Sequence, residues 1–360
     1  MMRAALALAR RSLGRTWPNP AVGCVIVRDG CVIARGRTQD GGRPHGEADA
    51  IAHATGSLKG ATAYVTLEPC SHHGKSPPCA DALIAAGVSR VVSALADPYP
   101  KVNGQGHAKL KAAGIAVEVG EGAKEAAEIN AGFLLRVREG RPLFHLKIAS
   151  SLDGHTATAS GESKWITGPA ARADGHRLRA THDAILVGAN TVDTDDPDLT
   201  CRLPGLDRYS PVRIVVDSKA RLSPASKLAA SAGDVPVWLV CTPQAPSAAR
   251  EALQAKGVEI LEVAATPAGR VDIAAAAIAL GSRGLTSVLV EGGGTIAAAF
   301  LKAGLVDRLS VYRGGLLMGS DSRSAVAELG LDGLDFAPRF SLVSARVVGG
   351  DTLETWRRAS

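Results

Sequence analysis

Two cysteines and two histidines are concentrated in the short segment EPCSHHGKSPPC, residues 68–79. Such a cluster is typical of a metal site, a disulfide loop or a redox pair. The chain has six cysteines, at positions 24, 31, 70, 79, 201 and 241, and they lack the regular spacing of a disulfide framework. Only Cys70 and Cys79 lie near other potential ligands, and the pattern fits a reducing compartment. The sequence therefore favours a metal site over a disulfide.

A zinc ion suits this segment together with His45 and Glu47, which open a predicted helix. His45, Cys70 and Cys79 supply three ligands and leave the fourth tetrahedral position for water. Because two thiolates nearly cancel the charge of the metal, a nearby carboxylate has to accept the proton of that water. Glu47, two residues after His45, is the candidate for this general base.

The order H-x-E, followed by P-C and a second cysteine, is the signature of zinc-dependent base deaminases. Two residues separate the cysteines in the usual signature, whereas eight separate Cys70 from Cys79 here. A closed structural site, with His72 or His73 as the fourth ligand, is the alternative. The pattern predicts a catalytic zinc and leaves the structural zinc open.

The elements that position these residues alternate between strands and helices. AVGCVIVRDGCVIARGRT predicts two strands joined by the tight turn Asp29-Gly30. GEADAIAHA predicts a helix with Ala48, Ile51 and Ala52 on one face, and TAYVTLEP predicts a buried strand. CADALIAAGVSRVVSALAD then predicts a helix, a glycine stop and a further strand. We expect an α/β sheet with helices on its faces.

A second α/β domain is predicted after EGRP, near residue 141, where the strand LFHLKIAS follows. The strands AILVG, RIVVDS, VWLVC and SVLVEGG then alternate with helical segments. The glycines of VEGGGT suit the pyrophosphate of a dinucleotide, although a tight strand-to-helix turn explains them about as well. Lys219, just after VVDS, is placed to hold a ribose phosphate. Lys147 stands in an apolar strand, either facing a cleft or snorkelling to water.

The composition narrows the class of protein. The 360 residues suffice for two domains, and no apolar run approaches the roughly 20 residues of a membrane span. A net charge of +6 suits a phosphorylated small molecule, while 4% aromatic residues leave few platforms for nucleic-acid bases. We therefore expect a soluble, cytoplasmic protein with no nucleic-acid or membrane partner. A transit peptide is the alternative for the arginine-rich helix predicted at the N-terminus.

WPNPAVGCVIV and TLEPCSHHGKSPPCADALIAAGVSRVV closely resemble the deaminase domain of bifunctional riboflavin-biosynthesis deaminase–reductases. The resemblance implies a cytidine-deaminase-like α/β/α fold over residues 1–141. The zinc ligands that it implies are His45, Cys70 and Cys79, with Glu47 as the catalytic proton carrier. It also implies that Asn19 holds the pyrimidine, that Lys75 contacts the substrate phosphate, and that His72 and His73 line the mouth of the site.

Three residues depart from the pattern of that family. Gly46 stands where an alanine is usual, but glycine leaves the side chains of His45 and Glu47 in place. In ADPYPKVNGQG, Tyr99 stands where an asparagine is common and Asn103 where a small residue is common. The contacts of this loop are therefore left open.

The second half resembles the reductase domain of the same family in LKIASSLDGHTATASGESKWITG, DAILVGANTVDTDDPDLTCR and VEGGGTIAAAFLKAGLVDRL. The resemblance implies a dihydrofolate-reductase-like α/β fold over residues 142–360 and NADPH as cofactor. The implied cofactor contacts are Ala149, Trp165, Thr191, Asp195, Ser218, Gly293, Gly294 and Thr295. The implied substrate contacts are Ser163, Arg179, Leu199, Arg202 and Glu291. Arginine suits a phosphate monoester because a guanidinium can hold it with two bonds.

Together these features predict a bifunctional enzyme that binds one zinc ion per chain and NADPH. It would remove an amino group hydrolytically from a pyrimidine nucleotide, 2,5-diamino-6-ribosylamino-4(3H)-pyrimidinone 5′-phosphate. It would then reduce the ribosyl side chain to give 5-amino-6-ribitylaminouracil 5′-phosphate. The alternatives are an RNA-editing (tRNA) base deaminase with an accessory domain and a non-catalytic zinc-clipped binding module. The sequence leaves the oligomeric state open, a homo-oligomer included.

Overall fold

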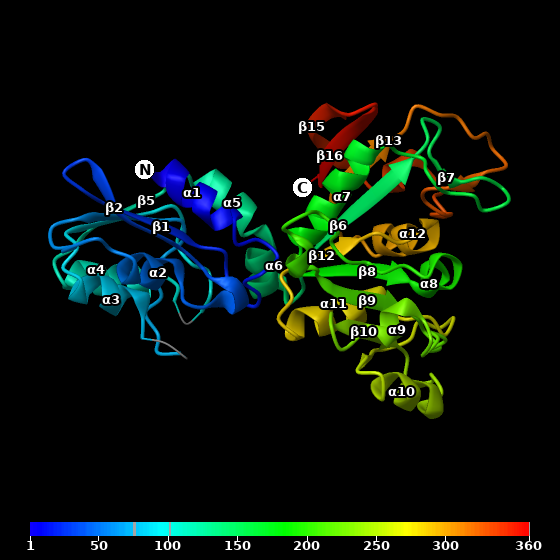
Figure 1. The fold of residues 1–360 in the computed structure, drawn as a ribbon, viewed down its shortest axis with the longest axis horizontal. Coiled ribbons are helices and arrows are strands. Elements are labelled where there is room, and N and C mark those ends of the chain that lie inside the picture. Colours follow the sequence, from blue (N-terminus) through cyan, green and yellow to red (C-terminus); the bar gives the residue numbers. More distant parts are fainter. Residues whose placement is uncertain (75–76, 101, 360) are drawn as a thin grey trace. The chain divides into compact units, whose positions relative to one another are not determined.

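The computed structural model describes residues 1–74, 77–100 and 102–359 and divides into two compact units, Met1–Gly140 and Arg141–Ser360 (Figure 1). The guanidinium of Arg141 donates hydrogen bonds to both carboxylate oxygens of Asp307, at 2.8 and 2.9 Å, which ties Arg141 to the second unit. None of the helices in these residues is long and apolar enough to cross a membrane.

A five-stranded sheet is the centre of the first unit. Its strands are β1 (Gly23–Arg28), β2 (Cys31–Arg37), β3 (Thr62–Val65), β4 (Arg90–Ser93) and β5 (Ala116–Val119), in the order β2-β1-β3-β4-β5. β1 is antiparallel to β2 and β3, whereas β3, β4 and β5 run parallel. The loops that follow β3 and β4 therefore start at the same edge of the sheet.

Helices cover both faces of this sheet. They are α1 (Met2–Arg10), α2 (Gly46–Ala52), α3 (Cys79–Ala85), α4 (Gln105–Ala112), α5 (Ala123–Ile129) and α6 (Ala131–Glu139), with a short 3-10 helix at Asp40–Gly42. Cys24 and Ile26 of β1 pack into one core with residues of α2, α3, α4 and α6, while Val25 packs into another core with α1 and α5. This alternation along the strand produces the three-layer α/β/α arrangement that was predicted.

The turn between β1 and β2 forms as the sequence predicts. Asp29 and Gly30 have φ angles of 51° and 76°, so both are in the left-handed region that a type I′ turn requires. Arg28 pairs with Cys31 across the turn. The hairpin register is therefore determined locally by the Asp-Gly pair.

Ala48, Ile51 and Ala52 share one face of α2 as predicted, but that face is only partly buried, with Ile51 packed against the core. The buried residues of this helix are Gly46, Glu47, Asp49 and Ala50, while Ala52 is exposed. Asp49 can be buried because its carboxylate accepts hydrogen bonds from the backbone N–H of Arg37, at 2.9 Å, and from the side chain of Gln39, at 2.8 Å. The satisfied acids thus lie on the face of the helix opposite to Ala48, Ile51 and Ala52, and apolar spacing does not identify that face.

The second unit is built on a nine-stranded sheet. Its strands are β6 (Leu143–Ser150), β8 (Ala184–Gly188), β9 (Val212–Val216), β10 (Val237–Cys241), β11 (Glu259–Glu262), β12 (Ser287–Val290), β13 (Val306–Arg313), β15 (Phe340–Val348) and β16 (Asp351–Arg358). The order is β11-β10-β9-β8-β12-β6-β13-β16-β15, and the first seven strands in this order run parallel. A separate two-stranded sheet pairs β7 (His155–Ala157) with β14 (Arg323–Ser324).

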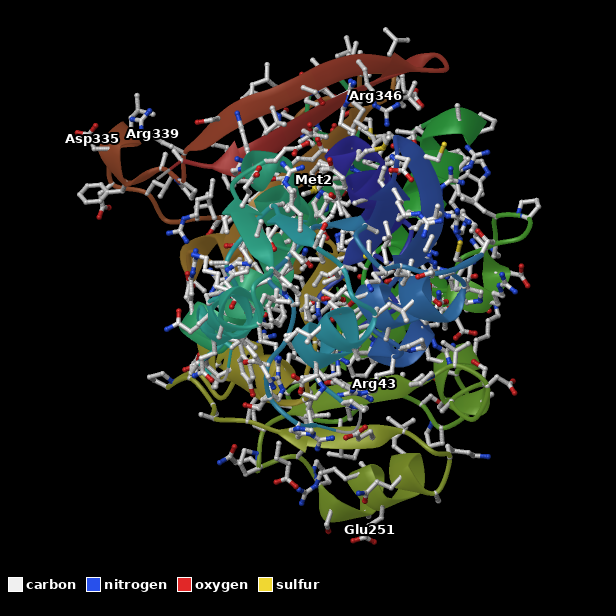
Figure 2. All side chains as sticks on the ribbon, turned by 90° about the vertical axis from the view of Figure 1, so that its left-hand side faces the viewer. Met2, Arg43, Glu251, Asp335, Arg339 and Arg346 are labelled. Carbon is white, nitrogen blue, oxygen red and sulfur yellow. The ribbon has the colours of Figure 1, made fainter. Side chains whose placement is uncertain are left out.

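The helices of this unit connect the parallel strands. They are α7 (Pro169–Ala180), α8 (Ala189–Asp195), α9 (Lys227–Ala230), α10 (Ser247–Gln254), α11 (Ile273–Ser282) and α12 (Gly294–Lys302), with 3-10 helices at Asp207–Tyr209 and Leu334–Phe336. Arg346 of β15, labelled in Figure 2, donates to the carboxylate of Asp174 in α7 at 2.9 Å. The hydroxyl of Tyr312 in β13 donates to the same oxygen at 2.7 Å. These bonds anchor α7 against the sheet.

Candidate functional site

Three potential metal ligands meet in the first unit. His45 directly precedes α2, Cys79 is the first residue of α3, and Cys70 lies in the loop that follows β3. His45 Nδ1 lies 3.6 Å from Cys70 Sγ and 3.4 Å from Cys79 Sγ, and the three ligand atoms all lie within 4.8 Å of one another. The fold therefore brings together the three residues that the sequence nominated.

The spacing and chemistry of this trio fit zinc. Ligand atoms roughly 2.0–2.3 Å from a tetrahedral zinc ion lie about 3.5 Å from one another, which matches the two nitrogen–sulfur distances. The hydrogen bond from the Cys79 thiol lowers the pKa of Cys70 to about 4, and the Cys79 backbone N–H also donates to Cys70 Sγ at 3.3 Å. This lowered pKa favours the thiolate form of Cys70, the form that binds zinc.

Glu47 is buried beside this trio, in the first turn of α2. Only 3% of it is exposed. Burial, followed by the negative charge of Cys70, raises the pKa of Glu47 to about 7. A carboxyl group that gains and loses its proton near neutral pH has the property required of a proton carrier.

The histidines of the insert are placed apart from this cluster. In the described part of the chain, the group of ligand atoms contains His45, Cys70 and Cys79 and neither His72 nor His73. The ring of His72 instead lies 6.0 Å from the ring of Tyr99, and His73 is exposed. This arrangement favours an open coordination position over a closed structural site.

Asn19 and Lys75 are predicted to contact the substrate of the first site, and the structure describes Asn19 but not Lys75. Asn19 is partly buried, and its side-chain amide donates to the carbonyl oxygen of Gly42 at 3.2 Å. A Cβ on Gly42 would lie 2.2 Å from Asn19 Nδ2, so a glycine is required there. Lys75 lies outside the described residues, and its contact with a phosphate stays a prediction.

Glu68 is a buried residue near this site that sequence reasoning overlooked. Its carboxylate accepts hydrogen bonds from the backbone N–H groups of Asp97, Gly104, Gly106 and His107, at 2.9–3.1 Å. Glu68 is 3% exposed and lies two residues before Cys70. One carboxylate thus ties the loop after β4 to the segment that carries Cys70, a candidate metal ligand.

Glu68→Gln is expected to lower the free energy of unfolding by about 2 kcal/mol or more. An amide nitrogen would replace one acceptor oxygen, and two buried N–H groups would lose their partner at about 1–3 kcal/mol each. Urea unfolding of the whole chain measures the effect. Glu118→Gln is the matched control, because the pair that Glu118 forms with Arg90 is exposed. Equal urea midpoints of unfolding for Glu68→Gln and Glu118→Gln would contradict the role of Glu68 in anchoring the loop after β4.

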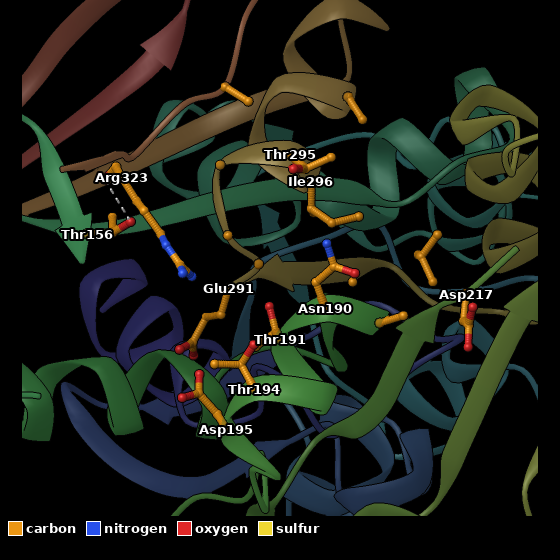
Figure 3. A pocket seen from close by; sticks show the side chains of 18 of the residues that line it. Thr156, Asn190, Thr191, Thr194, Asp195, Asp217, Glu291, Thr295, Ile296 and Arg323 are labelled. Carbon is orange, nitrogen blue, oxygen red and sulfur yellow. Dashed lines mark hydrogen bonds between the residues drawn. The ribbon is translucent and has the colours of Figure 1, made fainter. Parts of the chain in front are cut away.

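A cavity of about 940 Å³ lies at the carboxyl ends of β6, β8, β9 and β12 in the second unit. This edge of a parallel sheet is where α/β proteins usually bind ligands. Of the residues predicted to contact cofactor or substrate, those that line the cavity are Ala149, Ser163, Thr191, Asp195, Ser218, Glu291, Gly293, Gly294 and Thr295. Figure 3 shows Thr191, Asp195, Glu291 and Thr295 around it.

Four of the residues predicted to contact cofactor or substrate do not line the cavity. Trp165 is 68% exposed and its ring stacks on the guanidinium of Arg172 at 4.3 Å. Leu199 is buried in the core. Arg202 is half exposed and lies 3.7 Å from Asp198. Arg179 donates hydrogen bonds to Glu291, which does line the cavity. The contacts predicted for these four residues stay predictions.

Glu291 is the acidic centre of the cavity. Arg179 donates two hydrogen bonds to its carboxylate, at 2.8 and 3.0 Å, and Lys147 Nζ lies 3.8 Å away. Burial opposes ionisation, but the charges of Arg179 and Lys147 outweigh it and lower the pKa of Glu291 to about 2. Glu291 is therefore a fixed carboxylate, and Lys147 lines the cavity next to it.

Gly292, Gly293 and Gly294, at the turn from β12 into α12, have different structural roles. A Cβ on Gly292 would lie 2.7 Å from Ile296 Cβ, and one on Gly294 would lie 2.7 Å from the carbonyl oxygen of Ser324. A Cβ on Gly293 would meet nothing within 4 Å, so this residue faces open space. Gly292 and Gly294 therefore serve the packing of the turn, and Gly293 leaves room for a ligand.

Sequence reasoning missed several residues of the cavity. Thr156 of β7 and Arg323 of β14 line it from the two-stranded sheet, as Figure 3 shows, and Arg270 lines it from the loop before α11. Nothing local to these residues marks them. Lys219, which the sequence did suggest as a phosphate ligand, also lines the cavity.

Comparisons with known families assign each half of the chain. The family described as RibD C-terminal domain matches residues 142–353. The cytidine and deoxycytidylate deaminase zinc-binding region matches residues 1–95. These matches confirm the predicted fold class. They also confirm the predicted cofactors, zinc for the deaminase domain and NADPH for the reductase domain.

Proteins that match nearly the whole chain support the same family assignment. The chain is 45% identical to the riboflavin biosynthesis protein RibD of Escherichia coli K12, over 97% of this chain and 96% of that protein. It superimposes on Acinetobacter baumannii RibD with a TM-score of 0.88 and 38% identity, covering 100% of this chain and 98% of that one. A Thermotoga maritima diaminohydroxyphosphoribosylaminopyrimidine deaminase/5-amino-6-(5-phosphoribosylamino)uracil reductase matches with a TM-score of 0.86 and 35% identity, covering 99% and 97%.

The resemblance noted in the sequence is thus confirmed over nearly the whole length of the chain. A trio of candidate metal ligands with a buried carboxyl group occupies the unit that matches a deaminase, and a ligand-sized cavity occupies the unit that matches a reductase. The chain belongs to the RibD family, the bifunctional deaminase–reductases of riboflavin biosynthesis.

Proposed function

We propose that this chain deaminates 2,5-diamino-6-ribosylamino-4(3H)-pyrimidinone 5′-phosphate and then reduces the ribosyl group to give 5-amino-6-ribitylaminouracil 5′-phosphate. The observation that carries the proposal is the trio His45, Cys70 and Cys79 with the buried Glu47 beside it. We assign deamination to residues 1–141 and reduction to residues 142–360. The match of residues 1–95 to a deaminase zinc-binding region and that of residues 142–353 to the RibD C-terminal domain support this division.

In the first site, the residues of the chain bind the metal, hold the pyrimidine and move a proton. Bound zinc, held by the trio, supplies the Lewis acidity that makes water a nucleophile near neutral pH. Glu47 takes a proton from the attacking water and passes it to the leaving amino group, which departs as ammonia. Its pKa of about 7 suits both transfers. Asn19 orients the ring with its side-chain amide.

In the second site, the cavity holds the nucleotide cofactor and the sugar together. Bound NADPH supplies the reducing equivalents. The turn at Gly293 and the N-terminus of α12 receive the pyrophosphate, because the first N–H groups of a helix lack intrahelical partners. Arg179 fixes the Glu291 carboxylate, so the Lys147 ammonium beside it is the group able to give a proton to the reduced sugar. Arg202 contacts the substrate phosphate, as Lys75 does in the first site.

Gly293→Ala is expected to weaken NADPH binding about tenfold while leaving the stability of the chain nearly unchanged. Gly293 has φ −67° and ψ 177°, which alanine adopts freely, and its Cβ would enter open space in the cavity. Gly294→Ala is the matched comparison and is expected to destabilise the unit, since its Cβ would lie 2.7 Å from a carbonyl oxygen. Fluorescence titration and thermal unfolding measure the two effects. If Gly293→Ala binds NADPH with unchanged affinity, the pyrophosphate does not bind at this turn.

One assay tests the proposed function directly. The purified protein is given the diaminopyrimidine nucleotide with or without NADPH, while ammonia release and absorbance at about 340 nm are followed. Ammonia is expected in both cases, and oxidation of NADPH only after deamination. A tRNA deaminated faster than the pyrimidine nucleotide would instead support the RNA-editing alternative.

Dividing the chain tests the assignment of the two activities. A fragment that begins at Leu143 is expected to fold and to oxidise NADPH with the deaminated substrate, because the second unit has its own sheet and core. A fragment that ends at Arg141 is expected to release ammonia without NADPH. If both fragments are inactive while the whole chain works, the activities do not divide at this boundary.

We also infer a cytoplasmic enzyme whose partners are small molecules, with neither nucleic acid nor a membrane among them. The six cysteines are free thiols, which suits a reducing compartment. Whether the chain forms a homo-oligomer is measured by sedimentation of the purified protein.

A further inference from the structure

Lys147 stands on β6, an interior strand of the nine-stranded sheet, and its side chain lines the cavity with 19% of its surface exposed. Its ammonium lies 3.8 Å from a carboxylate oxygen of Glu291, which is longer than a hydrogen bond. The same oxygen accepts a hydrogen bond from Arg179 at 3.0 Å. Because a lysine side chain is long and flexible, it needs further contacts to hold its charge in one place.

The ring of Tyr312 supplies such a contact. Lys147 Nζ lies over this ring, 5.7 Å from its centroid. In the register of β6 and β13, Lys147 pairs with Ser310, and Tyr312 follows two residues later. The two side chains therefore emerge on the same face of the sheet. The negative face of an aromatic ring attracts a cation within about 6 Å of its centroid.

The Tyr312 ring is itself held firmly. Tyr312 is 1% exposed and packs in one cluster with Ala171 of α7 and Leu353 of β16. Its hydroxyl donates a hydrogen bond to Asp174 at 2.7 Å. Burial, followed by this hydrogen bond, raises the pKa of Tyr312, so the hydroxyl keeps its proton. What Tyr312 offers Lys147 is therefore the face of its ring.

The other neighbours of Lys147 confine its aliphatic part. A Cβ on Gly175 of α7 would lie 3.9 Å from Lys147 Cε, so the helix passes the lysine at a residue without a side chain. The hydroxyl of Ser310, the residue paired with Lys147 on β13, lies 2.8 Å from Nε2 of His145 and is engaged there. The ammonium is thereby left to the aromatic ring and the carboxylate.

We infer that Tyr312 is a positioning residue for the reduction, whose ring holds the Lys147 ammonium in the place from which it gives a proton to the reduced sugar. The inference rests on the proposed role of Lys147 in the second site. Tyr312 is not among the residues that line the cavity, so it acts through Lys147.

Steady-state kinetics of the whole chain separate positioning from packing. Tyr312→Leu removes the ring and is expected to lower kcat for NADPH oxidation about tenfold, with the KM values for NADPH and the deaminated substrate nearly unchanged. Tyr312→Phe keeps the ring face and is expected to restore kcat to within about twofold. Leu353→Ala is the matched control, because Leu353 pairs with Tyr312 across the sheet and packs in the same cluster. It loosens the same core but leaves the ring in place, and thermal unfolding shows that each variant is folded at the assay temperature.

Nuclear magnetic resonance detects the contact without turnover, in protein isotope-labelled at the lysine ε carbon. Protons above an aromatic ring resonate upfield of those in solvent-exposed lysines. The ε-methylene signal of Lys147, assigned by its loss in Lys147→Arg, is expected to lie upfield in the wild type and in Tyr312→Phe. In Tyr312→Leu it is expected to move to the position of an exposed lysine.

Three outcomes would overturn the inference. Equal kcat values for Tyr312→Leu and Leu353→Ala would mean that the ring only packs, and equal losses in Tyr312→Phe and Tyr312→Leu would assign the effect to the hydroxyl. An unchanged Lys147 signal in Tyr312→Leu would remove the contact itself. A wild-type protein that oxidises no NADPH would overturn the reductase function and this role with it, whereas the Lys147 signal would still report the contact, so the two failures are distinguished.

Discussion

Glu47→Gln is expected to leave zinc and fold intact and to lower the rate of ammonia release by about 10²–10⁴-fold, the usual contribution of a general acid–base group. Glutamine has nearly the same size as glutamate but cannot carry the proton between water and the leaving nitrogen. The buried position of Glu47 beside Cys70 and Cys79 excludes bulk water as a ready substitute. Ammonia release and zinc content, measured on the same preparation, separate a catalytic from a structural effect.

Asp49→Asn is the matched control for this experiment. Asp49 lies on the same helix, two residues further along, and is buried to a similar degree. Its carboxylate, however, accepts hydrogen bonds from Arg37 and Gln39, so its loss is expected to cost stability and to leave the chemistry in place. Near-normal deamination by Glu47→Gln would instead support a purely structural zinc site.

Cys70→Ser and Cys79→Ser are each expected to lose the metal and with it all deamination. Two of the three protein ligands are thiolates, and a serine hydroxyl does not ionise to replace one near neutral pH. Zinc content is expected to fall from about one ion per chain to nearly none after dialysis. NADPH oxidation with the already deaminated substrate is expected to persist, because the reductase cavity lies in the other unit.

Two other cysteines provide the controls for these variants. Cys31 is exposed and Cys241 is buried in the second unit, and both are free thiols. Cys31→Ser and Cys241→Ser are expected to keep their zinc. If Cys70→Ser and Cys79→Ser also retained full zinc occupancy, the ligand assignment would be wrong.

The sequence by itself identified the candidate residues of the first site, because short motifs carry them, although only the fold brings His45 to Cys70 and Cys79, 25 and 34 residues further along the chain. His45 and Glu47 stand two residues apart at the start of one helix, and Cys79 begins another directly after two prolines. The Asp29-Gly30 turn likewise has a conformation that its two residues dictate. In such cases residue type and short spacing are sufficient, because neighbours along the chain decide the geometry.

The face of α2 shows where local reasoning fails. Helical spacing places Ala48, Ile51 and Ala52 on one face, yet the most buried face of the helix carries Glu47 and Asp49. An acidic side chain can be buried when partners satisfy it, and the partners of Asp49 come from a different strand and loop. Hydrophobic periodicity contains no information about those partners.

Tertiary structure alone decided which residues surround the second site. The parallel strands β6, β8, β9 and β12 bring their following loops to one edge of the sheet, and β14 adds Arg323 from a separate hairpin. Gly294 looks like a ligand-binding glycine in the sequence, but the packing of Ser324 requires it. Likewise, Glu68 gains its four N–H partners only when the loop after β4 folds over it. These pairings join segments distant along the chain, and contact between such segments depends on strand order, which local composition does not specify.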